Sequence, residues 1–591
     1  MPRPRFFLPL LLLAVVLRPP VARAADPVPP AEVLAALVRQ NDTQVAAWLD
    51  ALPPRAGSPR EASRLVKLVA AAHAQSASRH HRQPAVRALL ERLVALLATR
   101  QNADGSFDAE VAAGNPQSPP DSGFALRHLA LALALLRADA DPAAAPARAG
   151  LERLLDRGAL ILRTGGVHTP NHRWVICGAL AQIEAVAPAP ANVARVDDWL
   201  GEGIDQDRDG QFSERSTIYS SVTAEALLDL AVALRRPALL EPLRRNLEFT
   251  LLNADPDGEL EHVSSRRQDQ LGREPRRLTA YYVPLRYLAI RDGNPRFAAA
   301  VALLERTDLE RLTEHLPEWM LWSDLRRPLP APGALPDDFV RHFPDSGLVR
   351  IRRGAVSATV FGGGDYAAHR DFSSGLSTNP TFFRFRKGGA VLDAVRIAPS
   401  FFNLGYFRSE RLDVAADGRT WLLSQTQRAA YYQPLPAEAR RAGGDYPLTD
   451  DGRFYSKMDF PRRPRDEKSL TTRVAVRERA GAPGEFELEI TSEGTPGIGL
   501  VVELCFRPGG TFAGAAPRAG EPDTFLLPAG TLRYTVGGDT VEVGPGAAIP
   551  GGRVGNLAGE AYSWRGGQLR PEGLRVYLGG VTPFRHTLTV R

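Results

Sequence analysis

The stretch 322–338, WSDLRRPLPAPGALPDD, separates two parts of the sequence that have different periodicities. Its prolines, Pro328, Pro330, Pro332 and Pro336, have no backbone N–H to donate and resist helical continuation. A proline-rich stretch of this kind is typical of a linker between domains. A chain of 591 residues is also too long for one compact core, so we expect one domain on each side of the linker.

Residues 25–321 precede the linker, and their apolar residues recur at helical spacing. One example is the set Val86, Leu89, Leu90, Leu93, Val94 and Leu97. A turn of the form Asp-Gly-x-apolar recurs in the connections, at 104–107, 209–212 and 257–260. Because a recurrent turn between helices indicates stacked helical hairpins, we predict an all-helical (α/α) toroid domain.

Residues 339–591 follow the linker, and their apolar residues recur with a period of two. Phe486, Leu488 and Ile490 alternate with glutamates, which is the pattern of a half-buried strand. No helical pattern alternates with these strands, so the sequence predicts an antiparallel β-sandwich. The expected fold class is therefore α+β multidomain, with an N-terminal toroid followed by a C-terminal sandwich.

The N-terminal segment 1–24 has the features of a secretory signal peptide. Arg3 and Arg5 precede the apolar run 6–17, and Ala24 ends a small-residue cleavage motif. We expect an exported protein, periplasmic or extracellular. A membrane anchor is the alternative, although the apolar run is too short to span a bilayer. No later stretch is long and apolar enough for stable membrane insertion.

The net charge of the chain indicates which kind of ligand it binds. The formal net charge is +6, from 73 Lys and Arg against 67 Asp and Glu. A basic surface favours anionic ligands, but no dense Lys/Arg block is present, so we expect no nucleic acid. A few placed arginines around an anionic polysaccharide or oligosaccharide fit better. Cys177 and Cys505 fall in different predicted domains, so a disulfide framework is not expected; the oligomeric state is left open.

The first polar constellation follows Pro170, which suits the entrance of a helix. Asn171 can donate hydrogen bonds, and His172 can donate or accept. Arg173 could pair with a carboxylate, and Trp174 offers an apolar face to a sugar ring. The alternative is an ordinary asparagine cap with a surface histidine and arginine.

The second constellation is 205–219. It begins Asp-x-Asp-x-Asp-Gly, like a Ca²⁺ loop, but Ser216 occupies the twelfth position where a bidentate glutamate belongs. A solvated turn is therefore favoured over an EF-hand. Tyr219 follows at the start of a helix, close to Glu214 and Arg215, and a phenol there could transfer protons if cations lowered its pKa. Packing is the alternative role for Tyr219.

The third constellation lies beyond the linker, after the strand-like segment 355–361. His369 is followed by Arg370 and Asp371, and Asp393 lies downstream. A histidine and an aspartate two positions apart can be a base with its orienting partner or a pair of metal ligands. A structural His–Asp hydrogen bond is the alternative.

Taken together, these residues resemble the heparinase II/III-like polysaccharide lyases and the related toroid-plus-sandwich alginate lyases. The resemblance rests on an ordered set: Asn171-His172 with Trp174, the segment 209–219, the motif FPDSGLV at 343–349, which resembles the opening of the family's β domain, and then His369 and Asp371.

The resemblance implies β-elimination at a uronic acid. Asn171 and His172 would neutralise the sugar carboxylate, and Tyr219 would be the acid. The base would be Tyr219, His172 or His369. The residues expected to bind substrate are Arg173, Trp174, Glu214, Arg215, Tyr282 and Arg370.

The sequence departs from the family at one position. The family's β-domain motif commonly reads His-x-His-x-Asp, whereas Ala367 stands here in place of the first histidine. The resemblance requires no cofactor, but it implies a structural divalent metal, Zn²⁺ or Ca²⁺, near His369 and Asp393. Two other functions stay open: a hydrolase using Glu214 and Asp209, and a glycan-binding relative without catalysis.

Overall fold

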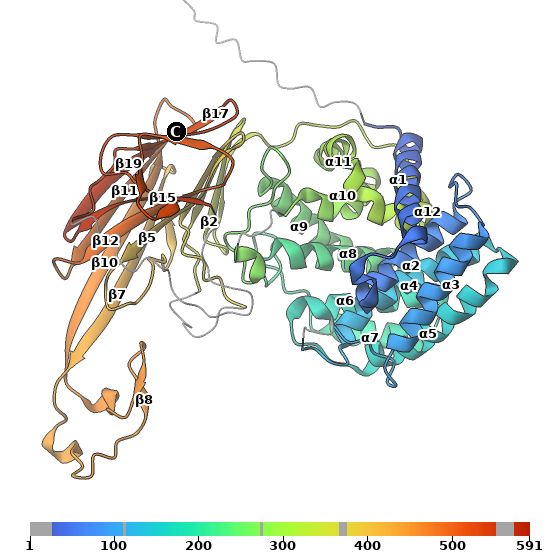
Figure 1. The fold of residues 1–591 in the computed structure, drawn as a ribbon, viewed down its shortest axis with the longest axis horizontal. Helices are drawn as coiled ribbons and strands as arrows, with labels where there is room; N and C mark the ends of the chain where they lie inside the picture. Colours follow the sequence, from blue (N-terminus) through green and yellow to red (C-terminus); the bar gives the residue numbers. More distant parts are fainter. Residues whose placement is uncertain (1–26, 110–113, 272–275, 366–374, 551–572) are drawn as a thin grey trace, which may run out of the picture.

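The computed structural model describes residues 27–109, 114–271, 276–365, 375–550 and 573–591. Figure 1 shows a helical domain beside a domain of sheets. Helical elements extend to Arg326, and the first strand begins at Asp338. The predicted fold class is confirmed. The predicted signal segment 1–24 lies outside the described residues. Within the described ranges, no helix combines the length and apolar character needed to cross a membrane.

The helical domain is built from α1 (Pro30–Asp50), α2 (Pro59–Ala74), α3 (Pro84–Arg100), α4 (Pro119–Asp139), α5 (Ala145–Thr164), α6 (Pro170–Val186), α7 (Pro190–Gly201), α8 (Thr217–Ala233), α9 (Leu240–Leu252), α10 (Tyr282–Asp292), α11 (Pro295–Thr307) and α12 (Leu316–Leu321). Proline begins many of these helices, where a missing N–H costs no hydrogen bond. The hydroxyls of Ser58, Ser118 and Ser216 cap α2, α4 and α8.

The helices form an inner and an outer layer. The inner helices α2, α4, α6 and α8 pack side by side in chain order, and α3, α5, α7 and α9 lie outside them. Gly123 of α4 faces Val175 of α6, and Arg137 near the end of α4 donates to the carbonyl of Val186 at the end of α6, so these two helices are parallel. Gly178 of α6 faces Ala226 of α8, and Gln182 donates to Asp229 one turn later, so α8 has the same direction and these helices start at one face. Most sides of an inner helix are covered, which explains why α4 and α6 are apolar nearly all round.

The three Asp-Gly turns share one conformation. Their glycines, Gly105, Gly210 and Gly258, have positive φ angles of 90°, 98° and 81°. In each turn the third residue before the glycine donates its N–H to the carbonyl of the residue after the glycine. A Cβ at Gly210 would lie 2.6 Å from the carbonyl oxygen of Arg245 on α9, so only glycine lets this turn pack so closely.

The β domain contains β1 (Asp338–Phe343), β2 (Leu348–Arg353), β3 (Val356–Phe361), β4 (Phe383–Lys387), β5 (Ala390–Pro399), β6 (Leu412–Val414), β7 (Thr420–Tyr432), β8 (Thr449–Asp450), β9 (Tyr455–Ser456), β10 (Arg465–Glu478), β11 (Phe486–Gly494), β12 (Gly499–Phe506), β13 (Thr511–Ala513), β14 (Ala516–Arg518), β15 (Glu521–Leu526), β16 (Leu532–Val536), β17 (Asp539–Gly544), β18 (Leu574–Val581) and β19 (Phe584–Val590).

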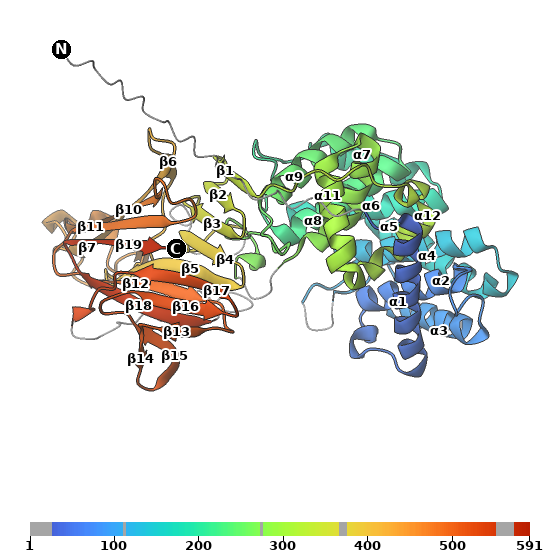
Figure 2. The same ribbon diagram turned by 90° about the horizontal axis from the view of Figure 1, so that it is seen from above.

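Two large sheets make the sandwich, as Figure 2 shows from above. One sheet has the order β1-β2-β3-β4-β5-β12-β18-β15-β14, and the other has the order β13-β16-β17-β19-β11-β10-β7-β6. Their facing sides share one apolar core. The strands pair antiparallel as expected, except that β15 and β18 are parallel. The long strands β7 and β10 extend beyond the sandwich toward β8 (Figure 1).

The first sheet meets the helical domain through buried opposite charges. Glu261, on the toroid loop after α9, accepts hydrogen bonds from Arg384 of β4 at 2.6 Å and Arg350 of β2 at 3.2 Å. Arg350 also binds Asp255 at 2.6 Å. Burial opposes ionisation of Glu261, but the guanidinium groups of Arg384 and Arg350 outweigh burial and hold its pKa well below the usual range.

We expect Glu261→Gln to destabilise the domain junction by about 3–5 kcal/mol, because two buried guanidinium groups lose their shared anion. Chemical unfolding, followed by fluorescence, should show the loss as a lower midpoint. The matched control is Glu489→Gln, which removes only the exposed pair with Arg585 and should cost under about 1 kcal/mol. Equal losses of stability in the two variants would contradict the claim that the buried charges at the junction stabilise the protein.

The stability of the junction should also depend on pH. The folded state holds the pKa of Glu261 below its unfolded value, so the stabilisation is complete above about pH 5 and is lost as the pH falls below about 4. Unfolding midpoints measured across this range should fall in acid for the wild type. In Glu261→Gln the fall should be smaller, because that carboxylate no longer titrates.

Candidate active site

The candidate site lies at the first turns of the inner helices α6 and α8, beside the β domain. Asn171 is the second residue of α6, and Tyr219 is the third residue of α8. The short helix η4 (Gln268–Leu271) contacts the start of α8 through Gln268 and Asp269. The structure therefore brings together two residues that the sequence places far apart.

Glu214 holds Asn171 in place. Its Oε2 accepts the main-chain N–H of Asn171 at 3.1 Å and the side-chain amide at 2.7 Å. Its Oε1 lies 3.4 Å from the guanidinium of Arg267. Burial raises the pKa of Glu214, while Asn171 and Arg267 partly oppose this rise. Glu214 was expected to bind substrate, but both of its carboxylate oxygens face protein groups, so it positions Asn171.

Arg267 joins Glu214 to Tyr219. Its guanidinium lies 4.7 Å from the centre of the Tyr219 ring, a cation–π contact. The hydroxyl of Tyr219 donates to Oε1 of Gln268 at 3.2 Å. Sequence reasoning missed Arg267. The run SSRRQDQ at 264–270, polar within a helical domain, is the signal that could have found it.

Asp269 fixes the start of α8. Its Oδ2 accepts from the hydroxyl of Ser216 at 2.9 Å and from the N–H of Thr217 at 2.9 Å. Its Oδ1 accepts from the hydroxyl of Ser265. Because Ser216 also caps the N–H of Tyr219, these contacts hold the tyrosine in a defined position.

His172 is partly buried beside Asn171. Burial, together with the nearby groups His168, Arg267 and Arg60, lowers the pKa of its imidazole to about 3. The ring of His168 packs edge-on at 4.8 Å. His172 is therefore neutral near pH 7, and its Nδ1 has no hydrogen-bond partner among the described residues.

The β domain reaches the site through Asp345 and Asp365. Arg215 donates to the carbonyl of Asp345, which places Arg215 across the junction. Arg266 binds Asp365 at 2.8 Å, and its carbonyl accepts the N–H of Gly375 at 2.7 Å. The predicted residues His369 and Arg370, with Ala367 and Asp371, lie outside the described residues.

Two motifs of the sequence resemblance contact each other at the junction. Asp209 of the Asp-Gly turn accepts from the N–H of Ser346 at 3.0 Å, and Arg208 binds Asp345. Asp207 accepts the N–H of Gln211. The aspartates at 207 and 209 thus build a turn and a contact between the domains.

The prediction that Trp174 and Tyr282 bind substrate is wrong. Trp174 is 3% exposed within the toroid core, and Tyr282 is fully buried with its hydroxyl bonded to Glu305. Neither ring has a face open to a sugar. Arg173 lies at the start of α6 and pairs with Glu202 at 2.8 Å.

The expected metal ligand Asp393 does not fit a cation site. Its Oδ1 accepts from Arg384 at 2.9 Å, and its Oδ2 accepts from Arg507 at 3.1 Å. Two guanidinium groups therefore bind both carboxylate oxygens at hydrogen-bond distance and leave neither oxygen for a metal ion.

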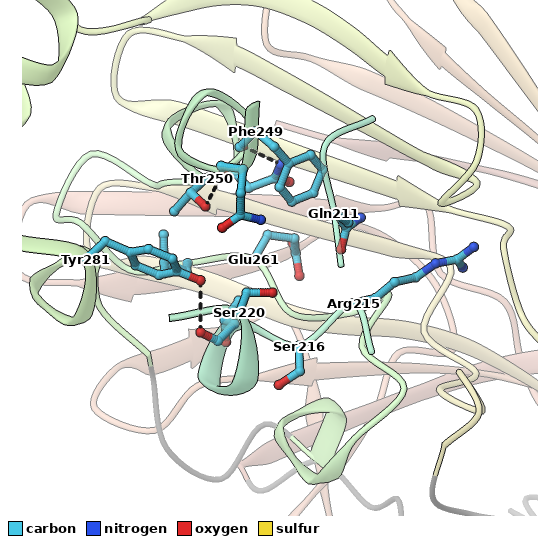
Figure 3. Close-up of a pocket in the computed structure, with 12 residues that line it drawn as sticks. Gln211, Arg215, Ser216, Ser220, Phe249, Thr250, Glu261 and Tyr281 are labelled. Atoms are coloured by element: carbon cyan, nitrogen blue, oxygen red, sulfur yellow. Dashed lines mark hydrogen bonds between the residues drawn. The ribbon is translucent and has the colours of Figure 1, made fainter. Parts of the chain in front are cut away.

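A polar pocket lies behind the 211–217 loop, between the helix starts and the domain junction. Figure 3 shows Arg215, Glu261 and Tyr281 around it. The hydroxyl of Tyr281 donates to the carbonyl of Thr217 at 3.0 Å and so supports the loop from behind. The pocket links the candidate site to the charges that join the domains.

No protein-family model matches the chain, and no curated protein matches its sequence. Solved structures do match its fold. A chondroitin AC lyase of Streptomyces coelicolor A3 aligns with a TM-score of 0.54 at 14% identity, covering 95% of this chain and 79% of that one. A Paenibacillus xanthan lyase aligns at 0.53 and 11%, covering 95% and 57%. Heparinase III aligns at 0.52 and 12%, covering 91% and 78%. This chain therefore has the fold of the toroid-plus-β-sandwich polysaccharide lyases.

Proposed function

We propose that this protein is an exported polysaccharide lyase that cleaves a uronic-acid-containing polymer by β-elimination. The observation that carries the proposal is the cluster of Asn171, Glu214, Arg267 and Tyr219, with neutral His172 beside it, at the starts of two inner helices. The matched structures are named as lyases of anionic polysaccharides, among them chondroitin and xanthan lyases.

The chemistry explains why this set of side chains suits the reaction. The C5 proton of a uronate becomes acidic only when the neighbouring carboxylate is neutralised. The base then takes this proton, the C4–O4 bond breaks as the C4=C5 bond forms, and an acid protonates O4. The guanidinium of Arg267 and the starts of α6 and α8 favour negative charge. Asn171 is 2% exposed and its amide donates to Glu214 in the free protein, so the amide must turn toward the sugar carboxylate on binding.

We assign the acid to Tyr219, a partly buried residue at the start of α8. The base is Tyr219 or His172, and His369 remains the expectation from sequence. Neutral His172 can accept a proton, and a bound uronate beside it would raise its pKa from about 3 toward the working range.

The inner helices offer a path for an anionic chain. Their first turns start at one face, so their positive ends act together. On α2, Arg60 lies 4.1 Å from the ring centre of Phe124 on α4, which adds a cation above an aromatic ring near the same face. These features favour a negatively charged glycan over a neutral one.

The two carboxylates that the hydrolase alternative would use, Glu214 and Asp209, are both bound to protein groups. Glu214 is bound to Asn171 and Arg267, and Asp209 is bound to Ser346. Neither carboxylate is placed to flank a glycosidic bond with a partner. Ala367, which stands where the family has a histidine, favours the third function, a glycan-binding protein without catalysis. A measurement of lyase activity distinguishes this function from the proposed lyase.

We expect incubation with a panel of uronate polymers to generate the ultraviolet absorbance of a 4,5-unsaturated uronate. Tyr219→Phe and Asn171→Ala should each lower kcat about 100-fold or more, because they remove the acid and the carboxylate contact. The control Tyr455→Phe changes a highly exposed tyrosine far along the chain and should retain full activity. Binding without any chromophore would favour the glycan-binding alternative, and full activity in Tyr219→Phe would refute the site.

Glu214→Gln should lower kcat by about tenfold or more with little change in KM, because it loosens Asn171 rather than removing a substrate contact. Steady-state kinetics on the best polymer measures the split. Glu152→Gln, at an exposed pair with Arg137, is the control and should change neither constant. A rise in KM alone would show that Glu214 contacts the substrate directly.

The free enzyme should keep His172 neutral down to about pH 3. Nitrogen NMR of the labelled imidazole should therefore show no titration of His172 near pH 6.5. Since Arg267 is one of the groups that lower this pKa, Arg267→Ala should raise it. A titration of His172 near pH 6.5 in the wild type would contradict its burial.

A further inference from the structure

A histidine and two aspartates, side chains that can bind a metal ion, lie close together at the opposite end of the inner helices. His73 belongs to the last turn of α2, Asp139 is the last residue of α4, and Asp141 follows two residues later. The His73 side chain is completely buried. The candidate active site lies at the starts of the inner helices, so the two places are separate.

The three side chains have the spacing of metal ligands. Nε2 of His73 lies 3.2 Å from Oδ2 of Asp141 and 3.6 Å from Oδ2 of Asp139. Two ligands at about 2.0–2.2 Å from one tetrahedral ion are roughly 3.3–3.6 Å apart. The separation of 3.6 Å lies in this range, that of 3.2 Å is slightly shorter, and all three ligand atoms lie within 4.8 Å of one another.

Of the three atoms that face one another, Oδ2 of Asp139 accepts a long hydrogen bond from Nε of Arg82 at 3.4 Å, and the other two lack a donor in the described ranges. Neither ring nitrogen of His73 nor Oδ2 of Asp141 has a hydrogen-bond partner among the described residues, although all are buried. A fully buried imidazole aimed at two carboxylates, without a hydrogen bond to either, needs a partner that the side chains do not supply. A cation at the centre of the three atoms would meet this need.

The remaining carboxylate oxygens are held by the protein. Oδ1 of Asp139 accepts from Nη2 of Arg82 at 2.9 Å, and Oδ1 of Asp141 accepts the N–H of Ala143 at 3.0 Å. Arg82 Nε is farther from Oδ2 of Asp139, at 3.4 Å, and Arg87 lies 3.9 Å from Oδ2 of Asp141. These outer contacts orient both Oδ2 atoms toward His73, as supporting groups do around metal ligands.

We propose that His73, Asp139 and Asp141 bind a divalent transition metal that ties the end of α2 to the end of α4. One imidazole and two carboxylates suit Zn²⁺, whereas Ca²⁺ and Mg²⁺ prefer oxygen ligands alone. Cys177 of α6 forms no disulfide, so in the described part of the toroid no disulfide acts as a crosslink. The ion supplies a crosslink there instead.

The test uses the full chain, stripped of metal with a chelator and then titrated with ZnCl₂. Calorimetry and elemental analysis should show one Zn²⁺ per chain, and the thermal midpoint should rise with Zn²⁺ but not with CaCl₂ or MgCl₂. Lyase turnover should not depend on Zn²⁺, so failure here is distinguishable from failure of the proposed function.

Asp141→Asn is the decisive variant, because an asparagine can still accept the N–H of Ala143 while the anionic ligand is lost. It should weaken Zn²⁺ binding by about 100-fold or more, and His73→Gln should do the same. Asp104→Asn is the matched control: Asp104 also accepts an N–H two residues on, from Ser106, and its variant should bind Zn²⁺ like the wild type.

Two results would overturn the proposal. One is a wild-type chain that takes up no stoichiometric Zn²⁺. The other is a folded Asp141→Asn variant, judged by circular dichroism, that binds Zn²⁺ as tightly as the wild type.

Discussion

The arrangement of the two domains depends on a buried set of opposite charges between them. Glu261 of the toroid is surrounded by Arg350 and Arg384 of the β domain, and Arg350 also binds Asp255. A buried carboxylate deprived of its cations would be strongly destabilised, so these charges favour one relative position of the domains. The starts of α6 and α8, which carry Asn171 and Tyr219, lie beside this junction. The charges at the junction therefore determine where these helix starts lie relative to the β domain.

The candidate site repeats the same principle on a smaller scale. Glu214 binds the amide of Asn171 and faces Arg267, and Arg267 covers the ring of Tyr219. Glu214 thus holds the amide and the cation in fixed positions before any substrate arrives. Glu214, which the sequence suggests as a substrate contact, instead positions Asn171 and Arg267.

The fold could be predicted because periodicity changes at the proline-rich linker, and Asn171 and Tyr219 could be placed because each begins a helix. The prediction that Trp174 and Tyr282 bind substrate is wrong because both side chains are buried, and residue type does not show which helices are covered on every side. Arg267 was missed because it lies on a connection without periodicity, and its contact with a tyrosine 48 positions away appears only in three dimensions. Sequence patterns thus predict elements, while burial and long-range ion pairs require the folded chain.

The central claim is that these residues carry out an elimination. Mass spectrometry of the oligosaccharides released from a uronate polymer, in water enriched in heavy oxygen, tests it most directly. The account predicts products that contain no heavy oxygen from the cleavage step and whose new non-reducing ends lack the elements of water. Incorporation of one heavy oxygen atom for each bond cleaved would show hydrolysis and contradict the account.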